Sequence, residues 1–175
     1  MNKILHSFLI AAALVAAQLL LFNNLQLRGL LDAFVAPCVY ILYLIVLPVG
    51  MSRVGLLLIS FALGVAVDFF SGTLGVNTSA CVLLGFVRPR VVMLLVGQEN
   101  VDKAMRPSIY TLGYMRWMGY ATVLAFVFHL ELFLIEVFSL YELHLTLLRT
   151  ALSTAAAVAL MMMLEIIFEK KDKRY

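Results

Sequence analysis

Three ionisable side chains in the second half of the chain have the residue types of a metal site. His129 and Glu136 are seven residues apart, so a helix would place them on one face, whereas Glu131 would point elsewhere. A metal ion needs at least one more ligand at the same depth, and the remaining candidates are Asp68 and His144. We therefore favour bundle-facing or interfacial polar roles over a metal site, with Glu136 hydrogen-bonded to a neighbouring helix.

Asp68 lies near the end of a long apolar run. It follows fourteen uncharged residues, Val54–Val67, and comes about one turn before Ser71 and Gly72. Two interpretations are open. We favour a fixed polar node between helices; the alternative is an interfacial carboxylate that touches water and caps the next turn.

The segment SGTLGVN after Asp68 predicts a tight turn. Gly72 and Gly75 can take positive φ, and Asn77, Thr78 and Ser79 offer side-chain oxygens to cap the next helix. No lysine follows the glycines, so the segment is not a phosphate-binding P-loop.

Arg88-Pro89-Arg90 places a proline between two permanent cations inside an apolar stretch. In one interpretation the helix continues with a kink, and both guanidinium groups reach headgroups or bind carbonyls freed by the kink. In the other the span ends early, and residues 90–105 lie along the inner surface. We favour the first, because VVMLLVG after Arg90 is apolar on every face.

The sequence contains no recognisable catalytic constellation. GxSxG and HExxH motifs are absent, and no nucleophile, base and orienting group can be named together. Cys38 and Cys81 lack metal-ligand spacing and are expected to be buried small hydrophobic residues. Basic residues are scattered rather than gathered with aromatic ones, which argues against nucleic-acid binding. We expect a protein that is not an enzyme and has no cofactor.

The composition places all these residues in a membrane protein. Hydrophobic residues make up 64% of the 175 and charged residues 13%, against about 45–50% and about 25% in soluble domains. A hydrocarbon core about 30 Å thick requires about 20 helical residues. Six stretches approach or reach that length and predict an all-α bundle of six transmembrane helices in one domain, residues 1–169, with a basic tail, 170–175: about 4–22, 33–50, 54–71, 78–97, 115–138 and 146–168.

Lysine and arginine predict the orientation of the bundle. With both termini in the cytoplasm, the inner segments carry Lys3, Arg53, Lys103, Arg106 and the basic tail. The outer segments then keep Arg28 and Arg149. The first apolar run ends without a small-residue cleavage site, so we expect it to be a retained anchor rather than a signal peptide. The tail is expected to contact anionic lipids.

Other residues predict how the helices pack. Pro37 and Pro48 should bend the second span near each end. Arg116-Trp117 resembles an interfacial anchor pair at the inner end of the fifth span. In the last span, Ser153-Thr154 and Ala155–Ala157 form a small-residue surface that another helix can approach closely.

The stretch LLLISFALGVAVDFFSGTLGVNTSACVLLGFVRP resembles the signature of the bacterial rod-shape-determining MreD family. In that family a Gly-x-x-x-Asp helix end is followed by Ser-Gly and Leu-Gly turns and by a helix ending in Gly-aromatic-x-Arg. VAPCVYILYLIVLPVG and FHLELFLIEVFS also resemble members, so the resemblance covers most of residues 33–138. The positions that match the family pattern are Gly64, Asp68, Ser71, Gly72, Gly75, Gly85 and Arg88.

The resemblance implies a non-enzymatic component of the cell-elongation machinery in the bacterial inner membrane. Members are similar in architecture to the six-helix substrate-binding subunits of energy-coupling-factor vitamin transporters. The implied partners are MreC and, through it, the RodA glycan polymerase, a penicillin-binding transpeptidase and MreB filaments. Our candidate structural or partner-binding residues are the seven matching positions together with Asn77, Pro89, Arg90, His129 and Glu136.

Two other classes compete with this interpretation. A substrate-binding subunit of a small-molecule transporter would fit the expected fold and the polar groups near the outer face, but it needs a pocket matched to one solute. Discontinuous helix pairs and paired halves, which indicate alternating access, are not evident in the sequence. An intramembrane enzyme is the least favoured class, because its catalytic groups cannot be named.

Overall fold

The computed structural model describes residues 13–16, 18, 36–97, 105–137 and 143–172, and its regular elements in these ranges are all helices. Residues 13–16 are helical. From residue 36 onwards the elements are η2 (Val39–Ile41), α3 (Leu42–Ile45), α4 (Arg53–Ser71), α5 (Val76–Val96), α6 (Ile109–Leu112), α7 (Tyr114–Val137) and α8 (Leu143–Asp172).

Four of these helices, α4, α5, α7 and α8, are long and apolar enough to cross a membrane. They begin and end within a few residues of the predicted spans 54–71, 78–97, 115–138 and 146–168, and α8 extends further in both directions. The prediction of an all-helical membrane protein is confirmed for the described chain. Most of the predicted first span, 4–22, lies outside the described residues.

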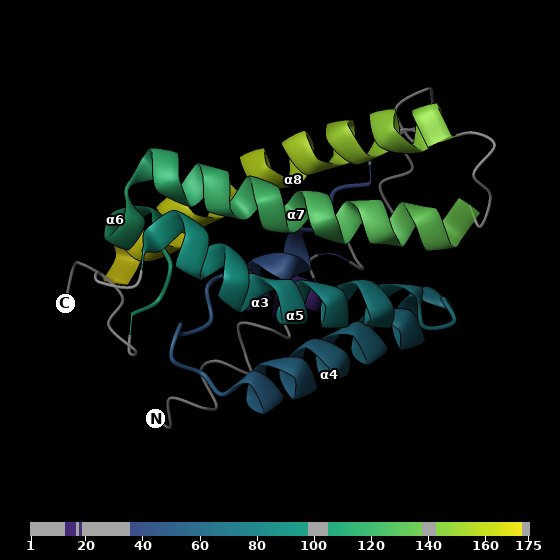
Figure 1. The fold of residues 1–175 in the computed structure, drawn as a ribbon, viewed down its shortest axis with the longest axis horizontal. Coiled ribbons are helices and arrows are strands. Elements are labelled where there is room, and N and C mark those ends of the chain that lie inside the picture. Colours follow the sequence, from purple (N-terminus) through teal and green to yellow (C-terminus); the bar gives the residue numbers. More distant parts are fainter. Residues whose placement is uncertain (1–12, 17, 19–35, 98–104, 138–142, 173–175) are drawn as a thin grey trace.

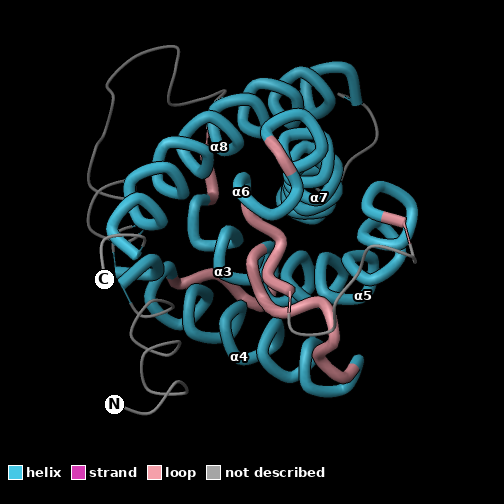
Figure 2. The backbone as a smooth tube through the Cα atoms, turned by 90° about the vertical axis from the view of Figure 1, so that its left-hand side faces the viewer, coloured by secondary structure: helices cyan, strands magenta, loops and turns pink. Residues whose placement is uncertain are grey.

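The long helices form a chain of neighbours in which α4 packs on α5, α5 on α7 and α7 on α8. Figure 1 shows them running roughly side by side. Viewed from the end, they surround the short helix α3 (Figure 2). The middle of the bundle is formed by a short piece of chain, residues 36–47, which we call the central segment. Three of its side chains have no exposed surface: Ile41, Leu44 and Ile45.

The predicted continuous helix over 33–50 is wrong for its described part. Residues 36–38 and 46–50 are not helical, and only seven residues, 39–45, form η2 and α3. Pro37 precedes this helical turn and Pro48 follows it. Proline disfavours helix at the residue before it and cannot donate a backbone hydrogen bond. The two prolines therefore explain why the helical turn of residues 39–45 does not continue at either end.

Helix α5 continues through Pro89 to Val96, as the favoured interpretation of Arg88-Pro89-Arg90 predicted. The alternative, in which the span ends at that point, is wrong. Cys38 and Cys81 are free and buried, as predicted. Trp117 corrects another expectation: it has no exposed surface and belongs to the core, whereas Arg116 beside it is exposed.

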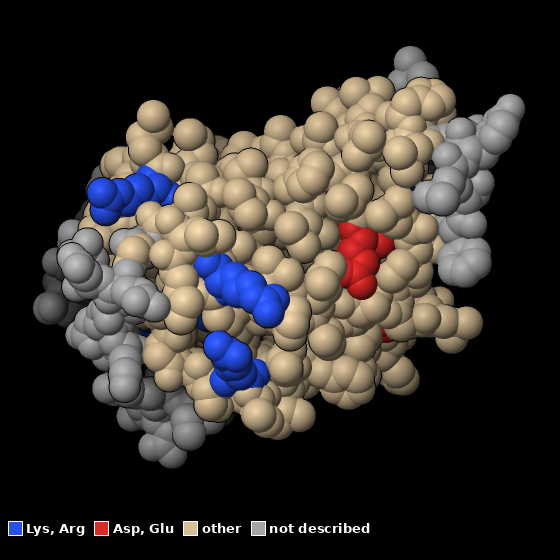
Figure 3. All heavy atoms as spheres, viewed as in Figure 1, with Lys and Arg blue, Asp and Glu red and all other residues tan. Residues whose placement is uncertain are grey.

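Charged side chains are segregated along the helices. On the face shown in Figure 3, lysine and arginine lie in the half that contains α6, and the acidic groups lie in the opposite half. The described acidic residues of that opposite half include Asp68 near the end of α4 and Glu131 and Glu136 near the end of α7. On this face, therefore, the basic and the acidic side chains lie towards opposite ends of the bundle.

Candidate functional site

Asp68 joins α4 to the start of α5. Its Oδ1 atom accepts hydrogen bonds from the Thr73 hydroxyl (2.5 Å) and from the backbone and side-chain nitrogens of Asn77 (both 3.0 Å). Its Oδ2 atom accepts from the Thr78 backbone nitrogen (2.9 Å) and hydroxyl (2.5 Å). Asp68 is buried, and these hydrogen bonds occupy both of its carboxylate oxygens with donors from its own chain.

This carboxylate caps α5 from the preceding helix. The N-cap residue of α5 is Gly75, which supplies no side-chain bond, and Asp68 accepts from the amides of Asn77 and Thr78 instead. A negative charge is favourable at a helix N-terminus. Capping of α5 by the oxygens of Asn77, Thr78 and Ser79 was therefore the wrong expectation, because Asn77 and Thr78 donate to the carboxylate. The predicted positive φ of Gly72 (+69°) and Gly75 (+82°) is confirmed.

Two helical glycines allow α4 and α5 to approach each other. A Cβ on Gly64 would lie 3.0 Å from the Thr78 nitrogen and 3.1 Å from the Asn77 carbonyl oxygen, and closer still to the Thr78 Cα. A Cβ on Gly85 would collide with the Ser60 side chain. The Gly64 contact is with backbone, which cannot rotate away, so this position requires glycine.

The Asp68 node continues into the centre of the bundle. The Tyr40 hydroxyl in η2 donates to Asn77 Oδ1 at 2.8 Å, and Tyr40 and Asn77 are both buried. Tyr40 also meets Phe128 of α7 in an edge-to-face contact, with ring centroids 5.9 Å apart. One polar network therefore links α4, α5 and the central segment. Ser71, another matching position, is the last residue of α4.

Arg88 binds the other end of the central segment. Its side chain is 2% exposed, and its Nη2 atom donates to the carbonyl oxygens of Ile45 (3.3 Å) and Leu47. Its Nε atom donates to the Tyr120 hydroxyl of α7 (3.0 Å), which donates in turn to Ile45 O (3.0 Å). A cation on α5 therefore satisfies carbonyls that α3 leaves open.

Arg90, two residues later, has a different environment. It is exposed, and its guanidinium carbon lies 4.7 Å from the centre of the Phe86 ring on the same helix. The arginines were predicted to reach headgroups or to bind carbonyls freed by a kink at Pro89. For Arg88 both are wrong, because it is buried and the carbonyls that it binds belong to the central segment.

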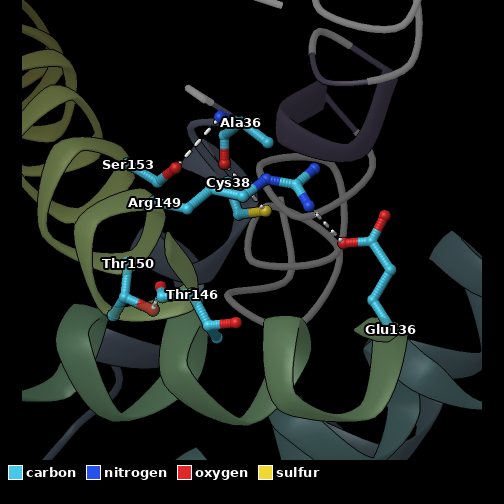
Figure 4. Close-up of polar contacts among 7 residues, drawn as sticks. All are labelled: Ala36, Cys38, Glu136, Thr146, Arg149, Thr150 and Ser153. Carbon is cyan, nitrogen blue, oxygen red and sulfur yellow. Dashed lines mark hydrogen bonds and ion pairs between the residues drawn. The ribbon is translucent and has the colours of Figure 1, made fainter. Parts of the chain in front are cut away.

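Side chains of α7 and α8 bind the first part of the central segment. The Cys38 amide donates to His129 Nε2 (3.4 Å), while His129 Nδ1 lies 2.7 Å from Ala125 O. The Ala36 amide donates to Ser153 Oγ on α8 (3.0 Å; Figure 4). The Gln18 side chain also accepts from the Val39 amide at 2.9 Å and donates to Pro37 O at 3.2 Å.

His129 and Glu136 do not form a metal site with other described residues. No group of three His, Cys, Asp or Glu side chains in the described part of the chain is placed to hold a metal ion. Glu136 makes an ion pair with Arg149 of α8 (3.4 Å; Figure 4), which places it against a neighbouring helix as expected. Arg149 also lies over the Phe133 ring, 4.5 Å from its centre.

Several polar residues at membrane depth form hydrogen bonds with the backbone of the central segment. A non-helical backbone can lie inside a membrane only where protein groups satisfy its hydrogen bonds. Three surrounding helices supply side chains that satisfy backbone hydrogen bonds of residues 36–47: Arg88 on α5, Tyr120 and His129 on α7, and Ser153 on α8. Arg88 and His129 were among the predicted structural residues, but Tyr120 was not. The sequence signal for its role is the pair of prolines, Pro37 and Pro48, that bracket the segment.

Comparison of the chain with protein-family models, with curated proteins and with solved structures gives no significant match.

Proposed function

We propose that the chain is a non-enzymatic scaffold of the MreD type, which works in the bacterial inner membrane within the machinery for cell elongation. In this proposal it crosses the membrane six times with both termini in the cytoplasm, and the second crossing is the broken segment that contains η2 and α3. Its partners are other membrane helices and, beyond them, the enzymes of wall synthesis and MreB.

The observation that carries the proposal is the use of polar groups inside the bundle. Asp68 accepts five hydrogen bonds from three residues of its own chain, and Arg88 donates to two carbonyls and a tyrosine. Catalytic and transport sites keep polar groups available for a substrate. These two residues are instead committed to holding helices in place, which suits a scaffold.

The matching positions of the family pattern also have structural roles that support the proposal. Gly64 and Gly85 allow two helices to touch, Gly72 and Gly75 form their turn, and Asp68 caps the second helix. In the proposal this rigid α4–α5 unit sets the shape of the bundle. Of the small-residue surface predicted on α8, Ser153, Thr154 and Ala157 are buried in the bundle. The single span of MreC packs instead against Ala151, Ala155 and Ala159, which are exposed at intervals of four residues.

Depletion of the protein from a rod-shaped bacterium that encodes it tests the proposal. We expect the cells to become round while they continue to grow for several generations, because lateral wall synthesis loses its organiser. Co-purification adds a second readout: Asp68→Ala should retain less MreC than the wild-type chain at equal membrane abundance. Cells that stay rod-shaped after complete depletion would refute the proposal.

A transporter subunit is the second candidate, and the broken segment at the bundle centre favours it. Unwound backbone at membrane depth often lines substrate sites in transporters. A groove of about 460 Å³ also lies between α7 and α8. Apart from two threonines, however, its lining is apolar: Met118, Thr122, Phe126, Ala151, Thr154, Ala155, Val158, Ala159 and Met162. Mass spectrometry of the purified protein distinguishes the candidates, since a stoichiometric small solute supports the transporter.

A further inference from the structure

Glu131 is an acidic side chain that the bundle does not use. It lies on α7 and is partly buried. Its Oε2 atom is inaccessible to solvent and has no hydrogen-bond partner among the described residues. The ion pair found in the described chain joins Arg149 to Glu136, not to Glu131. A carboxylate without a partner at this position needs an explanation.

Glu131 lies at a depth in the membrane where an ionisable side chain without a partner is energetically unfavourable. Arg116 and Glu136 are twenty residues apart on α7, which corresponds to about 30 Å, the thickness of the hydrocarbon core. Glu131 is five residues inside Glu136, or about 8 Å. Ionisable residues at such depth normally pair with another group or mark a functional pathway.

The other ionisable residues at similar depth have their partners within the chain. Asp68 caps α5, and His129 accepts from the Cys38 amide. Glu136, nearer the helix end, pairs with Arg149. Each of these side chains therefore has at least one partner in the described chain, whereas the buried Oε2 atom of Glu131 has none.

The residues around Glu131 suit the close packing of another helix. Val123, Val127 and Ile135 lie four residues apart in a row with Glu131, and such a row forms a ridge on the helix surface. Val123 is exposed, and Val127 and Ile135 are partly exposed. Their β-branched side chains have few rotamers to lose when a partner covers them. The ridge is separate from the α7–α8 groove, whose α7 wall consists of Met118, Thr122 and Phe126.

We propose that the ridge of Val123, Val127, Glu131 and Ile135 docks a transmembrane helix of a partner protein that carries one arginine or lysine at the depth of Glu131. The apolar ridge supplies the contact surface, and the carboxylate supplies the charge that selects the partner and fixes its depth. Lipid chains cannot fill this role because they have no hydrogen-bond donor. The inference rests on the proposed scaffold function, since a scaffold needs surfaces for more than one membrane partner.

The test uses the full chain in phosphatidylcholine vesicles and two synthetic probe helices. Each probe has a Leu/Ala run of about 20 residues; one carries a single Arg five residues from one end of the run, and the other carries Leu there. A fluorophore on the C-terminal tail reports association by energy transfer to the probe. The variants are Glu131→Gln and, as a matched control, Glu136→Gln.

We expect the Arg probe to bind the wild-type chain roughly three- to tenfold more tightly than the Leu probe, as one interhelical polar contact in a bilayer permits. Glu131→Gln should remove most of this preference, and Glu136→Gln should retain it. Equal binding of both probes to the wild-type chain overturns the proposal without any variant. The proposal is also overturned if Glu131→Gln prefers the Arg probe as strongly as the wild-type chain does, because the arginine would then bind a group other than the Glu131 carboxylate.

The outcome is separable from that of the proposed function. If the probes show no preference but depletion still rounds the cells, the scaffold function stands and this docking site falls. If the preference is found but depleted cells remain rods, the docking site stands and the shape function falls.

Discussion

Arg88 donates a hydrogen bond to the carbonyl oxygen of Leu47, so a cation from one long helix closes the end of the broken segment at the centre of the bundle. The two residues are 41 positions apart in the sequence. The guanidinium donates through Nη2 to two carbonyls and through Nε to the Tyr120 hydroxyl, whereas a lysine would have to make all its bonds from a single nitrogen. Contacts of this kind explain why Arg88 and Tyr120 lie inside an apolar bundle.

Replacement of Arg88 by methionine should strongly destabilise the protein. The carbonyls of Ile45 and Leu47 lose a donor in a buried site, and we expect the free energy of unfolding to fall by about 2–4 kcal/mol. Arg90→Met is the matched control. Arg90 is exposed and lies over the Phe86 ring, so its loss should cost about 1 kcal/mol or less. Unfolding in detergent micelles measures both, and equal losses would contradict the assigned role of Arg88.

Glycines at two helix positions should respond in opposite ways to alanine. Gly64→Ala forces a Cβ against the backbone of Thr78, so α4 and α5 must separate, and we expect a loss of about 1–3 kcal/mol. At Gly119 no atom lies within 4 Å of the added Cβ, and Gly119→Ala should be neutral or stabilising by up to about 1 kcal/mol. Thermal unfolding of the two variants in the same detergent checks the difference in sign.

Hydropathy predicted the four described spans because a helix that crosses the hydrocarbon core must be long and apolar and must satisfy its own backbone hydrogen bonds. It could not predict the central segment. VYILYLIVL is aliphatic apart from two tyrosines, so its composition is equally suited to a long helix, and the open backbone groups of this region find partners far away in sequence. Ser153, for example, is 117 residues from Ala36, the residue whose amide it accepts.

The Asp68 node was more accessible to sequence reasoning. Its partners Thr73, Asn77 and Thr78 lie within ten residues, and the glycine turn between them brings the chain back. The local pattern suggested two sources for the cap of α5. The oxygens of Asn77, Thr78 and Ser79 were the wrong one, although asparagine and threonine are common N-caps, whereas the capping role in the alternative interpretation of Asp68 is the one found. Trp117 was misplaced for a similar reason: tryptophan beside arginine is typical of an interface, but the packing of α7 decides whether it faces lipid or core.

The thiol of Cys38 should report whether the central segment is held in place. Cys38 and Cys81 are free and buried, so neither should react with a maleimide in the native protein. His129→Phe removes the acceptor of the Cys38 amide, and we expect Cys38 to react at least tenfold faster as its segment opens more often. Cys81 is the internal control and should stay protected. Mass spectrometry of labelled peptides distinguishes the two sites; equal acceleration at both would indicate global loosening.

Removal of the Asp68 carboxylate should loosen the start of α5 before it affects the rest of the bundle. Asp68→Ala leaves the amides of Asn77 and Thr78 without their acceptor, and we expect a loss of about 2–4 kcal/mol. Asp68→Asn keeps one acceptor oxygen but turns an amide group towards donors, so its loss should approach that of alanine. Glu136→Gln, a change at a half-exposed carboxylate, should cost less than about 1 kcal/mol. Hydrogen exchange locates the effect: the amides of residues 77 and 78 should exchange much faster in Asp68→Ala, while those in the middle of α7 keep their protection. Unchanged exchange at these two amides would show that the carboxylate does not cap the helix.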